Sequence, residues 1–339
     1  MKFSTIALGA ASVASVLAAP VECAKEKRAG KFLFTGVNES GGEFGQGTLS
    51  GQLGKDYTWP NKTAIDTLRA QGLNTFRIGT LMERITPDKL TGPINEAYFS
   101  GLEDLVKDVT SKGSYAIIDP HNYGRFYGKI ITSSADFGTW WKTVAARFKD
   151  NDKVIFDTNN EYHDMDNTLI HDLNQAAINN IRAAGATKQN IFIEGNSYSG
   201  AWHWIESGTG AALKDLKDPA DPTGKLLFYE MHQYLDTDGS GTNEACVSST
   251  IGAERLAVAT KWLKDNNKQG VLGEIGAGVN AQCEAAVKGA LQHLATNTAQ
   301  WKGVLWWAAG PWWADYIYSI EPGTGKAYAA YLPIIKSFI

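Results

Sequence analysis

Short apolar segments recur along the chain, each rich in β-branched and aromatic residues. Most of these segments are continuous apolar runs that do not alternate with polar residues. Such runs are typical of parallel strands that are covered on both faces. The pattern predicts strands at residues 31–38, 74–79, 114–122, 154–161, 190–196, 226–234, 270–276 and 303–309.

Between these segments the apolar residues recur with a helical period. In the first such stretch Ala64, Ile65 and Leu68 share one face, while Asp66 and Arg69 lie on another. Glycine follows three of the stretches, at positions 72, 113 and 185, as expected just past the end of a helix. The predicted helices cover residues 61–71, 95–112, 135–149, 167–184, 250–267, 281–299 and 326–338.

The alternation of strands and helices predicts an α/β fold. Eight strands in a chain of 339 residues favour a single-domain (β/α)8 barrel, the TIM barrel. The main alternative is a doubly wound open sheet, but no glycine-rich phosphate-binding motif follows any strand. No stretch rich in Ser, Thr or Pro divides the chain, so we expect one catalytic barrel over residues 29–339.

The first 28 residues have a different pattern. Lys2, an apolar run over residues 6–17 and the small residues that follow predict a secretory signal peptide over residues 1–18. The apolar run is too short to cross a membrane. Lys27-Arg28 has the form of a dibasic processing site, so residues 19–28 are expected to be a propeptide. The sequence therefore predicts a secreted, extracellular protein with no membrane partner.

Composition and charge narrow the classes of partner. The net charge is −4 and there is no basic run, so nucleic acid is not an expected partner. The chain contains 11 Trp, 13 Tyr and 13 Phe, which fit either an aromatic core or flat apolar surfaces for sugar rings. We expect the protein to be a monomer.

Two cysteines remain after the expected propeptide, Cys246 and Cys283. An even pair in a secreted protein predicts a disulfide, with two unlinked buried thiols as the alternative. Two glycosylation sequons occur, at Asn38 and Asn61. Asn61 lies in a predicted loop before a helix and is the better acceptor, because Asn38 lies at a strand end.

Two of the predicted strands run through apolar residues into a lone glutamate, Glu161 after Asn160 in one strand and Glu274 in the other. A carboxylate is rare at the end of a buried strand unless it is paired or used, although each could simply cap a turn. The C-terminal ends of barrel strands form the active face. Two acids there suit the hydrolysis of a glycosidic bond, which needs a proton donor and a group that stabilises or attacks the sugar.

Polar or aromatic residues end most of the predicted strands. Arg77 could keep one carboxylate ionised by charge pairing, and the histidines and Tyr234 could orient the carboxylates. Glu230 falls inside its strand, where a buried salt bridge suits it better. The polar loop at 235–249 follows the sixth strand, and Cys246 could tether it. The candidates at strand ends are Arg77, His121, Asn160, Glu161, His232, Tyr234, Glu274 and Trp307.

These strand ends resemble those of glycoside hydrolase family 5 in clan A, and are most similar to the secreted fungal endo-β-1,4-glucanases of that family. The likeness covers about Phe34 to Ile339 and includes Gly36-Val-Asn-Glu-Ser-Gly and the tryptophan-rich stretch 305–313. The resemblance implies that Glu161 is the acid/base and Glu274 the nucleophile of a retaining mechanism. It also implies that Asn160 contacts the sugar 2-hydroxyl and Trp307 forms a sugar platform, and it supports the pairing of the two cysteines.

The chain departs from the family pattern at two places. It reads Asn160-Glu161-Tyr162, where the commonest motif is Asn-Glu-Pro. In the segment that ends at Trp202, Tyr198 stands where relatives carry Trp, and both residues are expected to contact substrate. The smaller ring could weaken the binding of one glucose unit by about 1 kcal/mol.

The leading hypothesis is a secreted retaining endoglucanase that cuts cellulose and related β-glucans. The same chemistry on mannan, xyloglucan or mixed-linkage glucan is the alternative. A carbohydrate-binding protein built on an inactive barrel would have lost a glutamate or Arg77, and this chain keeps them. No Cys/His pair has metal-ligand spacing, so neither a metal nor another cofactor is expected. The mechanism predicts carboxyl groups about 5 Å apart.

Overall fold

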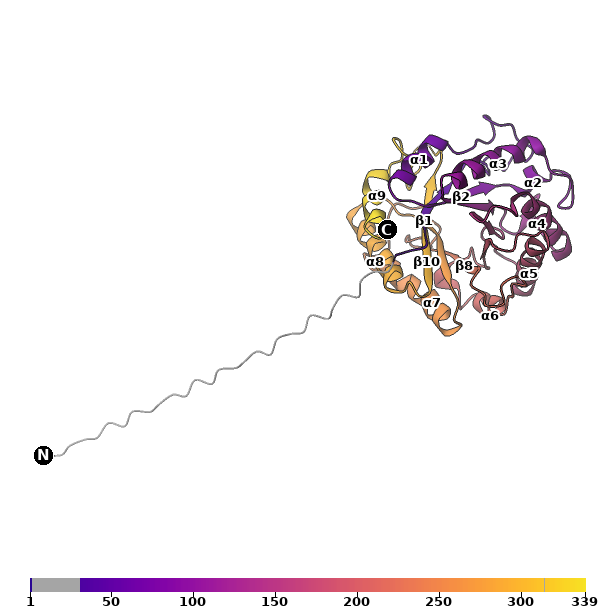
Figure 1. The fold of residues 1–339 in the computed structure, drawn as a ribbon. Coiled ribbons are helices and arrows are strands. Elements are labelled where there is room, and N and C mark those ends of the chain that lie inside the picture. The colour runs from indigo at the N-terminus through magenta and orange to yellow at the C-terminus, as the bar shows by residue number, and fades with distance from the viewer. Residues whose placement is uncertain (2–30, 314) are drawn as a thin grey trace.

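The structure is a computed structural model that describes residues 1, 31–313 and 315–339 (Figure 1). Apart from Met1, the signal peptide expected over residues 1–18 and the propeptide expected over 19–28 lie outside the described residues. Helices surround a central sheet whose strands run through the middle of the molecule (Figure 1).

The sheet is a closed barrel of parallel strands in the order β1-β10-β9-β8-β7-β6-β3-β2. Gly36 of the first strand pairs with Thr75 on one side and Leu305 on the other, which closes the cylinder. The predicted (β/α)8 barrel is confirmed, and so are the eight predicted strands. They are β1 (Phe34–Glu39), β2 (Thr75–Thr80), β3 (Tyr115–Pro120), β6 (Val154–Asp157), β7 (Asn190–Ile193), β8 (Leu227–His232), β9 (Gly270–Ile275) and β10 (Trp301–Ala309).

The seven predicted helices are also present, and polar side chains fix where several of them begin. Asn61 and Asn280, for example, each accept a backbone N–H of the first turn that follows. Gly72, Gly113 and Gly185 have φ of 106°, 87° and 97° and follow helix ends, as predicted. The helices are α1 (Lys62–Ala70), α3 (Glu96–Ser111), α4 (Ser134–Phe148), α5 (Asn167–Ala183), α7 (Ile251–Asp265), α8 (Ala281–Thr296) and α9 (Tyr328–Lys336).

Several short elements were not predicted, because too few residues carry a period. They are α2 (Met82–Ile85), the hairpin β4 (Arg125–Phe126) and β5 (Lys129–Ile130), the 3₁₀ turn η1 (Ala201–His203) and α6 (Thr209–Leu213). Among the described residues, no helix combines the length and the apolar character needed to cross a membrane.

The interior of the barrel is apolar at one end and polar at the other. Phe192 and Phe228 each pack edge to face with Phe34 in a small buried cluster contributed by strands. Nearer the C-terminal ends of the strands the buried residues include Arg77 and several carboxyl groups. This change of character places the polar chemistry at the face where a barrel carries its active site.

Candidate active site

One buried arginine bonds to most of the polar groups at this end of the barrel. Arg77 of β2 is fully buried, its Nη1 donates to Oε1 of Glu274 at 3.1 Å, and its Nη2 donates to Oδ1 of Asn160 at 2.7 Å. Burial opposes the charge of Arg77, but the surrounding carboxylates raise its pKa, so it stays a cation. Sequence reasoning expected Arg77 to pair with one carboxylate, and it contacts five. The other four, each with an oxygen within 3.2 Å, are Asp119, Asp157, Glu194 and Glu230.

Glu274 of β9 is buried and has a hydrogen-bond donor on each oxygen. Arg77 occupies Oε1, and the hydroxyl of Tyr234 donates to Oε2 at 2.5 Å. Burial raises the pKa of Glu274; His232 and Arg77 oppose this rise, and Glu161 adds to it. Donors on both oxygens favour the ionised form of this carboxyl.

Glu161 does not end a strand, so the prediction was wrong in this detail. Strand β6 ends at Asp157, although the chain continues to bond to its neighbours through Thr158 and Asn160 as a strand would. Glu161 follows with φ of 52°, a left-handed conformation that is strained for a residue with a side chain. Its backbone N–H donates to Oε2 of Glu194 at 2.7 Å, which holds this strained position.

Glu161 and Glu274 meet beside His232, which ends β8. One oxygen of each glutamate and a ring nitrogen of the histidine all lie within 4.8 Å of one another. Nδ1 of His232 lies 2.7 Å from Oε1 of Glu161 and 3.7 Å from Oε2 of Glu274. Burial alone would lower the pKa of His232, but Glu274 and Glu194 raise it well above its ordinary value. A charged His232 stabilises negative charge on whichever of the two glutamates is ionised.

His121 contacts Asn160 through the amide nitrogen that Arg77 leaves free. Its Nδ1 lies 2.9 Å from Oδ2 of Asp119, and its Nε2 lies 3.3 Å from Nδ2 of Asn160. Its ring stacks on Trp307 with centroids 5.3 Å apart. Burial would lower the pKa of His121, but Asp119 and Glu274 raise it to about 8. The predicted strand-end residues therefore do come together in one site.

An open cleft of about 1210 Å³ lies over these groups. Eight of the ten predicted catalytic and substrate-binding residues line it, while Arg77 and Asn160 are buried beneath. Sequence reasoning missed several lining residues. Tyr123 and His163 each lie two residues after a predicted one, a signal that could have found them, whereas Tyr316 lies in an irregular segment with no such signal. The predicted residues that line the cleft are His121, Glu161, Tyr198, Trp202, His232, Tyr234, Glu274 and Trp307.

Tyr198 is presented by an unusual turn. Ser197, Tyr198 and Ser199 have φ of 53°, 58° and 52°, so three successive residues are left-handed. The N–H of Tyr198 donates to the carbonyl of Tyr162, and the hydroxyl of Ser199 donates to the carbonyl of Glu230 at 2.7 Å. Tyr198 is 50% exposed as a residue, and its ring stacks on His163 at 4.3 Å between centroids. The turn thus holds the aromatic ring of Tyr198 at the edge of the cleft, where it is accessible to a ligand.

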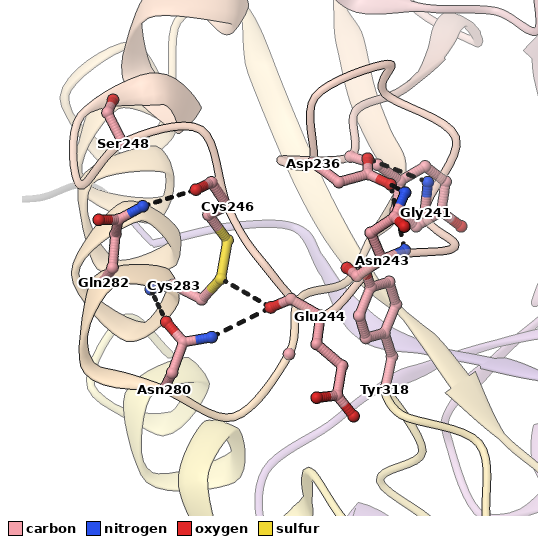
Figure 2. Close-up of a disulfide and its surroundings, with 12 residues drawn as sticks. Asp236, Gly241, Asn243, Glu244, Cys246, Ser248, Asn280, Gln282, Cys283 and Tyr318 are labelled. Carbon is pink, nitrogen blue, oxygen red and sulfur yellow. Dashed lines mark hydrogen bonds between the residues drawn. A yellow bond between two sulfur atoms is a disulfide. The ribbon is translucent and has the colours of Figure 1, made fainter.

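The predicted disulfide is present and tethers the loop after β8 (Figure 2). Cys246 of the loop is bonded to Cys283 in the first turn of α8. Around the bond, Nδ2 of Asn280 donates to the carbonyl of Glu244 at 3.0 Å. Nε2 of Gln282 donates to the carbonyl of Cys246 at 2.5 Å. The loop end is therefore fixed to a barrel helix by both covalent and hydrogen bonds.

The tip of the same loop is fixed by Asp236. Its buried carboxylate accepts the backbone N–H groups of Gly241 at 3.1 Å and Thr242 at 3.2 Å. Nδ2 of Asn243 also donates to it at 3.2 Å (Figure 2). Residues 238–242 line the cleft, so these bonds set the shape of one cleft wall.

Among the residues that the structure describes, two groups of side chains have the separation of metal ligands. The first is Glu161, His232 and Glu274, and the second replaces the two glutamates by Glu194 and Glu230. In the second group the Arg77 guanidinium lies within 3.2 Å of both glutamates and supplies the positive charge that a cation would bring. In the first group Arg77 and Tyr234 already bond the two oxygens of Glu274.

The two sequons differ in accessibility. Asn38 is buried, its Nδ2 donates to the carbonyl of Gly273 at 2.8 Å, and its Oδ1 accepts from Arg77 at 2.9 Å. Its side chain is therefore committed to the barrel interior. Asn61 is exposed at the start of α1, where its Oδ1 accepts the N–H of Thr63.

The family description "Cellulase (glycosyl hydrolase family 5)" matches residues 37–310, most of the chain. The chain belongs to this family. It is therefore an enzyme, a glycoside hydrolase, and every candidate at the strand ends lies within the matched range.

Individual family 5 proteins match over nearly the whole chain. The probable endo-β-1,4-glucanase B of Neosartorya fischeri is 55% identical over 339 residues, which is 100% of both chains. The endo-β-1,4-glucanase B of Emericella nidulans is also 55% identical with the same coverage. The structure of XacCel5A in complex with cellopentaose has a TM-score of 0.85 and 34% identity, covering 91% of this chain and 99% of that one.

Proposed function

We propose that this family 5 glycoside hydrolase is a secreted, retaining endo-β-1,4-glucanase with Glu161 as acid/base and Glu274 as nucleophile. The observation that carries the proposal is the spacing of the two carboxyl groups, with one oxygen of each within 4.8 Å of the other. Retaining enzymes hold these groups about 5 Å apart, whereas inverting enzymes leave about 6.5–9.5 Å for a water molecule.

The contacts support a different role for each glutamate. Glu274, with Arg77 and Tyr234 donating to its oxygens, attacks the anomeric carbon as a carboxylate and forms a bond to the sugar. Glu161 gives its proton to the departing glycosidic oxygen in the same step. Glu161, now ionised, takes a proton from a water molecule that attacks the anomeric carbon and releases the Glu274 carboxylate. Two displacements at one carbon restore the starting configuration.

The substrate proposal rests on the cleft and on the relatives. An open cleft admits the middle of a long chain, which endo-cleavage requires, and the rings of Tyr198, Trp202 and Trp307 line it. Asn160 would reach the 2-hydroxyl through Nδ2, because its Oδ1 is bonded to Arg77. Two relatives are named as endo-β-1,4-glucanases, and a solved relative binds cellopentaose.

We also propose how the secreted protein is processed, glycosylated and assembled. Residues 1–18 would be removed as a signal peptide and 19–28 as a propeptide, Asn61 would carry a glycan, and the enzyme would act as a monomer without a cofactor. The disulfide supports an oxidising compartment. N-terminal sequencing of protein from the culture medium, a mass shift on enzymatic deglycosylation, and size-exclusion chromatography test these points separately.

The deciding experiment compares hydrolysis rates on cellulose, mannan, xyloglucan and mixed-linkage glucan. We expect the highest rates on β-1,4-glucan, and a preference for mannan would overturn the substrate proposal. NMR of the first products should show retained β configuration. Glu161→Gln and Glu274→Gln should abolish turnover and keep the fold, whereas Glu206→Gln, an exposed control, should stay active. Full activity in Glu274→Gln, or net inversion, would overturn the mechanism.

A further inference from the structure

A buried cation outside the cleft lies against an aromatic ring that lines it. Trp202 lines the cleft, and Arg255, which extends from α7, does not. The Cζ atom of Arg255 lies 4.0 Å from the centroid of the Trp202 ring. A guanidinium at this distance over an indole is attracted to the ring and favours one orientation of it.

Arg255 is itself held by hydrogen bonds to the loop after β8. Its Nη1 donates to the carbonyl of Tyr234 at 2.6 Å, and its Nη2 donates to the carbonyl of Thr237 at 3.3 Å. The residue is only 6% exposed. A planar fork with two fixed donors has little freedom to rotate, so the ring contact is fixed as well.

The loop after β8, to which Arg255 donates hydrogen bonds, also packs against Trp202. A Cβ placed on Gly239 would lie 2.8 Å from Cζ2 of the Trp202 ring, so the loop backbone lies directly against it. The backbone N–H of Trp202 donates to Oε1 of Gln233 at 3.0 Å. Asp236 and the disulfide hold the same loop from its two ends (Figure 2).

We propose that Arg255 is a positioning residue that orients Trp202 for the sugar on the leaving-group side of the cleaved bond. The inference rests on the proposed function, in which Glu161 protonates the departing oxygen. The segment that carries Trp202 is joined to the loop of Glu161 by the hydrogen bond from Tyr198 N–H to the carbonyl of Tyr162. This bond ties the Trp202 segment to the acid/base loop, and both residues line the cleft, so the proposal assigns the Trp202 ring to the departing part of the chain.

The test compares two substrates in steady-state kinetics. Cellopentaose places glucose units on the leaving-group side, whereas an aryl β-cellobioside places only its aryl group there. We expect Arg255→Met to raise KM for cellopentaose about fivefold and to change kcat/KM for the aryl substrate less than about twofold. Arg255→Lys, which keeps the charge but not the fork, should recover part of the loss. An equal loss on both substrates would mean that Arg255 acts through Tyr234 and the nucleophile, and would overturn the proposal.

A double-mutant cycle separates positioning from general stabilisation. In a Trp202→Ala background Arg255→Met should change KM for cellopentaose no further, and additive effects would contradict the proposal. Arg147→Met is the matched control, because Arg147 lies 5.0 Å over the Phe99 ring away from the cleft. If Arg255→Met does not fold, the Arg255→Lys variant carries the same comparison with about a twofold rise in KM.

The same experiment separates failure of this inference from failure of the proposed function. If the unmodified enzyme cleaves neither glucan substrate, the proposed function fails. The cycle is then run on the oligosaccharide of whichever polymer the enzyme does cleave. A KM change that depends on Trp202 would support the positioning role there, and a change that is independent of Trp202 would overturn it.

Discussion

The hydroxyl of Tyr234 donates a hydrogen bond of 2.5 Å to Oε2 of Glu274. Because Arg77 donates to the other oxygen, the carboxyl group of Glu274 is fixed in rotation as well as in position. A group that must attack a single carbon atom gains from such fixation, since misalignment of an ångström is costly in rate. The pair is therefore the most direct point at which to perturb the proposed nucleophile.

Replacing Tyr234 with Phe should lower kcat about tenfold and move the acid limb of the pH–rate profile to higher pH. Loss of the donor disfavours the ionised carboxylate, so the pKa of Glu274 should rise further above its ordinary value. The measurement is kcat between pH 3 and pH 8 on a soluble glucan. Tyr331→Phe is the control, because its hydroxyl bonds only a carbonyl outside the cleft. An unmoved acid limb would contradict this account.

His121 should make stability depend on pH near neutrality. Its pKa is raised to about 8 from 6.5, so its charged form stabilises the folded state fully below pH 6.5. That contribution is lost as the pH rises through 8, and a shift of this size corresponds to about 2 kcal/mol. Urea unfolding at pH 6 and pH 8.5 should show a smaller pH dependence in His121→Gln than in the unmodified protein. An equal pH dependence of the two proteins would refute this prediction, and His171→Gln, at a partly exposed histidine, serves as the control.

Removing the disulfide should lower the free energy of unfolding by about 3–4 kcal/mol, because it closes a loop with a sequence separation of 37 residues. The change is Cys246→Ser combined with Cys283→Ser, measured by chemical unfolding. A reducing agent should destabilise the unmodified protein and leave the double variant unchanged. Equal sensitivity of the two proteins to the reducing agent would count against this explanation.

Tyr198→Trp should strengthen binding of cellopentaose, with KM falling about fivefold, because a larger ring offers more surface to a sugar. The left-handed turn is held by backbone and Ser199 contacts, so the new side chain need not disturb it. Tyr198→Ala should raise KM instead. If both variants bind cellopentaose as the unmodified enzyme does, Tyr198 does not contact the substrate.

The sequence predicts the barrel well because parallel strands buried on both faces are continuous apolar runs. Arg77, His232 and Glu274 were found for a related reason, since a polar residue within or at the end of such a run is conspicuous. The predicted end of the strand before Glu161 was less accurate, because the backbone continues to form hydrogen bonds to strands β3 and β7 after β6 has ended.

Contacts that join distant segments could not be predicted. Glu194 lies 117 residues from Arg77 in the sequence, and the hydrophobic pattern around either residue does not predict their ion pair. Arg255 has the same difficulty, because on its helix it looks like any other charged residue. The proposed role of Arg255 follows only from its hydrogen bonds to the loop after β8 and its contact with Trp202, which the sequence does not reveal.

The contacts of Arg77 have a consequence for how the protein folds. One guanidinium bonds to groups carried by or just after β1, β3, β6, β7, β8 and β9. A half-barrel would leave this cation, or the carboxylates that surround it, without partners in a partly dehydrated interior. Partial assemblies of the strands are therefore penalised, and the barrel should close in one cooperative step, with no independently stable fragment that carries half of the active site.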